Sequence, residues 1–69
     1  MEKIEIETEY IRLDQLLKYS GIVQTGGNSK ILIQEGSVKV NGNIVTERGK
    51  KIRKGDIVTM EGDIEFLVV

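Results

Sequence analysis

The two ends of the chain show the alternation of apolar and polar residues that is typical of strands. In residues 2–9, Ile4 and Ile6 occupy one side of the extended chain, and the other side carries Glu5, Glu7 and Glu9. Residues 64–69 follow the same pattern, with Ile64, Phe66 and Val68 on one face. A period of two residues predicts a half-buried strand at each end of the chain.

Two helices are predicted between these strands. In residues 11–20 the spacing of the leucines changes to three and four, which is the period of a helix, and Gly21 suits its left-handed C-terminal cap. A second helix is predicted from Thr25, whose hydroxyl can cap free amides, to about Glu35, with Gly36 at its C-terminal end.

A hairpin and two further strands are predicted after the helices. Residues 38–45 contain an Asn-Gly pair between two runs of β-branched residues, and both residues of the pair tolerate positive φ. Residues 46–54 are predicted to form a basic, flexible connection, and a strand follows at 57–58. The pattern predicts an α+β fold with two short helices packed on a small, mostly antiparallel sheet of four to five strands. Residues 1–69 are predicted to form a single domain.

The composition excludes most catalytic and metal chemistry. The 69 residues include no cysteine and no histidine, so the chain lacks a thiolate, the usual general base and the commonest zinc ligands. We therefore expect no enzymatic activity, no cofactor, no metal and no small-molecule substrate. The N-terminal stretch is acidic, and no apolar run reaches the roughly 20 residues of a membrane span, so we expect a cytosolic protein without membrane contact.

The net charge of −1 conceals a segregation of charge along the chain. Residues 1–17 carry two basic and five acidic residues, and residues 55–69 carry four acidic residues and no basic one. Residues 18–54 carry eight basic residues and two acidic ones, a net charge of +6. This distribution predicts one anion-binding face. The alternative is that basic and acidic segments interleave in the fold and cancel.

The start of the second predicted helix is a candidate phosphate site. It combines helix amides, glycines that let a ligand approach the backbone, and a lysine, although its spacing is not that of a Walker loop. The candidate residues are Thr25, Gly26, Gly27, Asn28 and Lys30. The alternative is an ordinary helix entry in which Thr25 only caps the helix.

The remaining candidate contacts are basic residues and one turn residue. Residues 48–54 place five bases within seven positions, which favours a phosphate-facing loop. Near a helix start, Arg12 and Lys30 are predicted to hold a phosphate more firmly than a base in the flexible connection. Asn41 is a candidate contact at the tip of the hairpin, and the alternative is that it is needed only for the conformation of the turn. The additional candidates are Arg12, Lys18, Lys39, Asn41, Arg48, Lys50 and Lys51.

In combination these features resemble the S-four RNA-binding domain, which has an alpha-L-like fold and is named after a ribosomal small-subunit protein. The resemblance spans about residues 11–60. It rests on Arg12-Leu13-Asp14 with Leu16 and Leu17, Gly21, Thr25 before Leu32-Ile33 and Gly36, Val38 to Gly42, and Gly55-Asp56 with Val58. The small stand-alone bacterial members, often called YaaA-type, share the Gln-Thr-Gly-Gly sequence at 24–27 and the N-terminal strand.

The resemblance implies that the two helices and the hairpin bind structured RNA, either ribosomal or transfer RNA. The expected protein is a monomeric ribosome-associated or ribosome-maturation factor. The family usually has Arg after Ser or Thr at the second helix start, whereas Gly26 and Gly27 stand here, so backbone amides and Lys30 would replace that arginine. The alternative function is a protein-interaction module that uses acidic residues at 5–9 or 61–65 on a basic partner.

Overall fold

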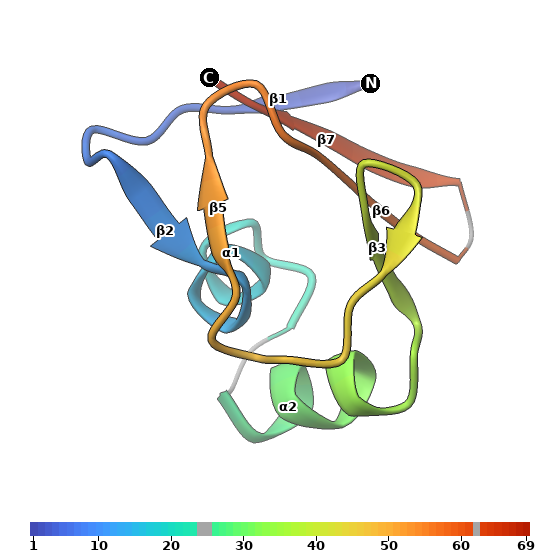
Figure 1. The fold of residues 1–69 in the computed structure, drawn as a ribbon. Coiled ribbons are helices and arrows are strands. Elements are labelled where there is room, and N and C mark those ends of the chain that lie inside the picture. Colours follow the sequence, from blue (N-terminus) through green and yellow to red (C-terminus); the bar gives the residue numbers. More distant parts are fainter. Residues whose placement is uncertain (24–25, 62) are drawn as a thin grey trace.

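The computed structural model describes residues 1–23, 26–61 and 63–69. Within these residues the chain forms two helices and seven strands (Figure 1). The strands are β1 (Glu2–Ile4), β2 (Tyr10–Arg12), β3 (Val38–Val40), β4 (Asn43–Ile44), β5 (Lys51–Arg53), β6 (Ile57–Met60) and β7 (Ile64–Val68), and the helices are α1 (Leu13–Tyr19) and α2 (Gly26–Gln34). One sheet has the order β1-β7-β6-β3-β4, and β2 and β5 form a separate two-stranded sheet. Within the described residues, no helix has the length and apolar character that crossing a bilayer requires.

One face of the five-stranded sheet belongs to the core. Val40 of β3 lies opposite Val58 of β6, and Val58 lies opposite Phe66 of β7, so the three buried side chains share a face. The strand pairs of this sheet are antiparallel, except that β1 runs parallel to β7 at one edge (Figure 1). The predicted α+β fold with a mostly antiparallel sheet is confirmed.

The predicted strand over residues 2–9 is divided in the structure. β1 ends at Ile4, and the chain enters the two-stranded sheet as β2. The prediction that the first helix includes Ile11 is wrong, because Ile11 pairs with Ile52 of β5 and α1 begins at Leu13.

The predicted connection over residues 46–54 contains a strand. β5 pairs antiparallel with β2, and its central residue, Ile52, is fully buried. A single apolar residue between a lysine and an arginine gives too short an alternation to predict a strand from the sequence. The strand forms because its backbone pairs with β2, which lies far away in the sequence.

Two turns that the sequence predicted from glycine are confirmed. After α2, Gly36 adopts a φ of 83°, and its N–H donates to the carbonyl oxygen of Ile33 at 3.1 Å. Between β3 and β4, the turn residues Asn41 and Gly42 have φ values of 52° and 86°. Two successive positive φ values match the right-handed twist of a tight hairpin.

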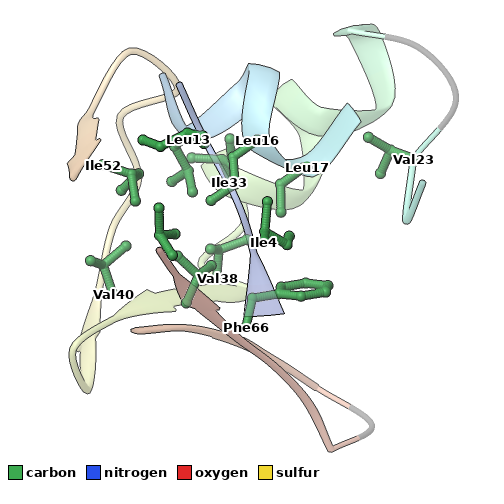
Figure 2. Packing of buried hydrophobic residues seen from close by; sticks show 13 residues of the cluster. Ile4, Leu13, Leu16, Leu17, Val23, Ile33, Val38, Val40, Ile52 and Phe66 are labelled. Carbon is green, nitrogen blue, oxygen red and sulfur yellow. The ribbon is translucent and has the colours of Figure 1, made fainter. Parts of the chain in front are cut away.

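The core lies between the helices and the inner face of the five-stranded sheet (Figure 2). From α1, it contains Leu13, Leu16 and Leu17, all fully buried. Ile33 of α2 and Ile52 of β5 are also fully buried. Because a chain of this length buries a limited share of its surface, each large core side chain carries a substantial part of the stability.

We expect Leu16→Ala to lower the free energy of unfolding by about 2 to 5 kcal/mol, because truncating a buried leucine leaves a cavity. In a domain of this size, this corresponds to a decrease in Tm of more than about 10 °C. The matched control is Ile31→Ala, since Ile31 is 61% exposed. Thermal unfolding followed by circular dichroism measures both variants. Equal Tm values for the two would show that Leu16 does not support the core.

Candidate nucleic-acid interface

Exposed basic side chains gather around the first turn of α1. They come from β2, from α2, from β5 and from the segment that precedes β5. We define this basic surface by Arg12, Lys30, Arg48, Lys50 and Lys51, all of them exposed. The contacts that bring these residues together are mostly made by the backbone.

The segment before β5 is fastened to the start of α1. The carbonyl oxygen of Lys50 accepts a hydrogen bond from the Leu13 N–H at 2.8 Å, and that of Arg48 accepts one from the Asp14 N–H at 3.0 Å. These bonds satisfy two amides that the helix itself leaves without a partner. Figure 1 shows the segment, coloured yellow to orange, passing α1 on its way to β5. The predicted flexible connection is therefore held at both of these basic residues.

Asp14 joins three parts of the basic surface. Its Oδ2 lies 3.2 Å from Nη2 of Arg12, and its Oδ1 accepts a hydrogen bond from the Gln15 N–H at 2.9 Å. Its carbonyl oxygen accepts a hydrogen bond from the Ser29 hydroxyl of α2 at 3.2 Å. Asp14 is only 9% exposed, and Ser29 is fully buried. The bond with Ser29 is buried and the other two contacts are part-buried, and together they connect β2, α1 and α2.

The position of Arg12 is explained by Asp14. A basic residue next to a helix N-terminus is unfavourable for the helix dipole. The ion pair with Asp14 offsets this effect, while the Arg12 side chain stays 50% exposed. The guanidinium also lies close to Gly49, where an added Cβ would come 3.9 Å from Nη2. Arg12 is thus fixed on one side and open to a ligand on the other.

Two cations face each other across the two-stranded sheet. Arg12 of β2 is the register partner of Lys51 of β5, and like charges directly opposite each other destabilise a strand pair. Asp14 balances part of the charge on Arg12, and Nζ of Lys51 lies 4.9 Å from the centroid of the Tyr10 ring. This cation–π contact stabilises the lysine only modestly. A bound anion would lower the repulsion that remains.

The start of α2 lies beside this surface. The hydrogen bond from Ser29 to Asp14 anchors the first turns of α2 to α1, and the exposed Lys30 directly follows Ser29 in the chain. The predicted site residues that the structure describes here are Gly26, which begins α2, and the exposed Gly27, Asn28 and Lys30. Thr25, the predicted cap, lies outside the described residues.

Two predicted contact residues lie away from the centre of the basic surface. Lys39 points to the outer face of the five-stranded sheet, because its neighbours Val38 and Val40 are buried on the inner face. Lys18 is exposed in the last turn of α1, about one helical turn beyond Asp14.

Asn41 serves the turn in which it lies. Its Nδ2 donates to Oδ1 of Asp56 at 3.0 Å, and its Oδ1 accepts a hydrogen bond from the Ile57 N–H at 2.9 Å. Both ends of the amide are therefore used to join the β3–β4 hairpin to the start of β6. The structure thus gives Asn41 a structural role, and its contact with RNA stays a prediction.

Asp14 and Ser29 are the positions whose importance the sequence concealed. In the sequence, Asp14 is one of several scattered carboxylates of the kind that cap helices or serve turns, and Ser29 is a small residue one turn before Leu32 and Ile33. A serine within an apolar stripe does carry a signal, since a buried hydroxyl almost always has a hydrogen-bond partner. The identity of that partner, 15 residues away in the chain, is visible only in the fold.

Fold and surface together define a small α+β domain with one basic face. Residues 4–69 match the family model described as S4 domain. The chain belongs to the S4 domain family, as the resemblance to the S-four domain predicted.

Three proteins are similar to this chain over most of its length. A Bacillus subtilis protein named "Probable ribosome maturation protein RlbA" is 42% identical over 66 residues, which cover 96% of this chain and 93% of that protein. The solution structure of Escherichia coli YbcJ, described as revealing an ALFAL motif involved in RNA-binding, has a TM-score of 0.75 and 33% identity, with coverage of 100% of this chain and 87% of YbcJ. A tyrosine–tRNA ligase of Ralstonia nicotianae is 30% identical over 64 residues, 93% of this chain but 16% of the enzyme.

We expect Asp14→Asn to lower the free energy of unfolding by about 1 kcal/mol or less, because the amide keeps an acceptor for Gln15 while the half-exposed ion pair with Arg12 is lost. Asp14→Ala removes both contacts and should lower it by about 1 to 3 kcal/mol. Denaturant unfolding measures both variants. If Asp14→Ala were as stable as the parent, Asp14 would not hold the surface together.

Proposed function

We propose that this protein binds structured RNA through its basic surface. The observation that carries the proposal is the gathering of cations around the start of α1 in a chain whose net charge is −1. Placing Arg12 opposite Lys51 is unfavourable for the free protein. A polyanion would turn this repulsion into attraction.

The relatives support an RNA ligand in a ribosomal setting. The Bacillus subtilis relative is named for ribosome maturation, and the YbcJ structure is described by a motif involved in RNA-binding. We infer for this chain a ribosome-associated or ribosome-maturation role on ribosomal RNA. Transfer RNA is the other structured RNA that the family relation supports, since one relative is a tRNA ligase. We propose that the protein acts as a cytosolic monomer.

Recognition would depend on phosphates and on the shape of the RNA. Cations at fixed spacing on one face match a phosphate backbone, whereas stacking on bases needs exposed aromatic rings. Aromatic residues make up 4% of the chain. The ring of Tyr10 already contacts Lys51, so Tyr19, which is 66% exposed, is the more accessible of the two tyrosines. Electrostatic attraction should therefore dominate the affinity.

We propose binding without catalysis. A general base or a nucleophile at an RNA site is most often a histidine or a cysteine, and the sequence has neither. The match to the tyrosine–tRNA ligase covers a small share of that enzyme, which is compatible with a binding segment.

Salt should weaken RNA binding steeply. If about four phosphates are contacted, the slope of log K against log salt concentration should be about −3, because each neutralised phosphate releases a counterion. Titrating a structured ribosomal RNA fragment at several salt concentrations measures this slope. An affinity that does not change with salt would contradict an electrostatic interface.

Substitution of single lysines should locate the contact. We expect Lys30→Ala and Lys50→Ala each to weaken RNA binding about three- to tenfold and to reduce the salt slope by about 1, because each removes one phosphate contact. The sequence predicted a larger loss at Lys30 than at Lys50. The hydrogen bond from Leu13 to the Lys50 carbonyl removes the reason for that difference.

Lys39→Ala is the matched control, because it changes the net charge equally but lies on the outer face of the sheet. Its RNA affinity should stay close to that of the parent. Equal losses in Lys30→Ala, Lys50→Ala and Lys39→Ala would mean that binding follows total charge and that the basic surface is not the interface.

A further inference from the structure

A surface hollow of about 830 Å³ lies at the other end of α1 from the basic surface. Ser20, which follows α1, lines one wall. The half-buried Ile22, Met60 and Ile64 form an apolar floor, with the buried Phe66 among them. Because α1 has seven residues, about 10 Å of helix separates this hollow from the basic surface.

The hollow is acidic at its rim. The carboxylates among its lining residues are Glu2, Glu61, Asp63 and Glu65. None of the lining residues is a lysine or an arginine, and in the described part of the chain none of these carboxylates forms an ion pair. The fold thus places four carboxylates around an apolar floor, at the opposite end of α1 from the basic surface. The positive groups near them are the α-amino group of Met1, which also lines the hollow, and Lys39, whose register partner is Thr59.

We propose that this hollow docks a basic, partly apolar segment of another protein. Lysine or arginine head groups of the segment would pair with the rim carboxylates, while an apolar side chain would lie on Ile22, Met60 and Ile64. A methionine in the floor can adapt its shape to such a side chain. Charge complementarity selects this occupant, since RNA would be repelled by the carboxylates and an acidic segment would leave them unpaired.

The two charged ends would let the protein contact two partners at once. Basic segments are typical of proteins that themselves bind nucleic acid. The structure therefore fits a bridge between an RNA and a basic protein on the same RNA. This bridge rests on the proposed RNA binding, whereas docking of the basic segment does not.

The probe is a short synthetic peptide in which single leucines are spaced by lysine and glycine, with its binding to the full chain followed by fluorescence anisotropy. The combined variant Glu61→Gln, Asp63→Asn and Glu65→Gln should bind it about tenfold more weakly, which corresponds to the loss of three ion pairs at the protein surface. The amides keep the shape of the side chains, and asparagine tolerates the φ of 60° that Asp63 adopts.

The matched control is the combined variant Glu5→Gln, Glu7→Gln and Glu9→Gln, which changes the net charge equally between β1 and β2. None of these residues lines the hollow, so peptide affinity should stay near that of the parent. Docking would be overturned if the parent chain failed to bind the peptide, or if both combined variants lost affinity equally. A peptide with serine in place of leucine should bind more weakly, and equal binding would overturn the role of the apolar floor.

RNA binding is measured on the same variants, so that the two proposals can fail separately. The combined variant at positions 61, 63 and 65 should bind the ribosomal RNA fragment at least as well as the parent, because these substitutions only remove negative charge. Weaker binding of the fragment by this variant than by the parent would overturn the assignment of the two ligands to opposite ends of α1.

Discussion

The first turn of α1 depends on two hydrogen bonds that come from outside the helix. A helix of seven residues is too short to be stable alone, and Arg12 at its N-cap position offers no side-chain hydrogen bond to the free amides. The carbonyl oxygens of Arg48 and Lys50 accept those bonds instead. The same contact that completes α1 therefore brings the most basic segment of the chain to the helix start.

Burial of polar contacts makes this arrangement rigid. Asp14 and Ser29 lie beneath the surface, and the buried hydrogen bond between them joins α2 to α1. The part-buried ion pair with Asp14 holds Arg12, so separating α2 or Arg12 from the start of α1 requires breaking one of these bonds. Arg12 and Lys51 are held opposite each other despite their repulsion. An arrangement that is unfavourable in the free protein and favourable around a polyanion is characteristic of a binding site rather than of a stabilising surface.

Much of the fold could be predicted from the sequence because local signals agree with it. The leucine spacing in α1 and the glycine at position 36 correspond to helices and their ends, and the Asn-Gly pair corresponds to the observed hairpin turn. β5 could not be predicted, because Ile52 is its single apolar residue and the strand depends on a partner, β2, about 40 residues away in the chain. Because β5 pairs with β2, the segment that the sequence predicts to be flexible has a defined position beside α1.

The candidate site was predicted in its composition but not in its arrangement. Charge segregation indicated Lys30 and the bases after residue 47, and a position near a helix start indicated Arg12. Their gathering, however, depends on backbone bonds between distant segments. Asn41 shows the opposite case, since a polar residue at an exposed turn resembles a contact residue while its amide is used by Asp56 and Ile57. Side-chain type indicates what a residue can bind, and only the fold shows what it already binds.

RNA contact at the start of α1 is tested most directly by an NMR titration of the isotope-labelled chain with a structured ribosomal RNA fragment. The backbone amide signals of residues 13–15, of residues 48–51 and of Lys30 should show the largest changes in chemical shift. The signals of Lys39 and of the acidic hollow should change little. Changes concentrated at Lys39 and Asn41, with the start of α1 unaffected, would contradict binding at the basic surface.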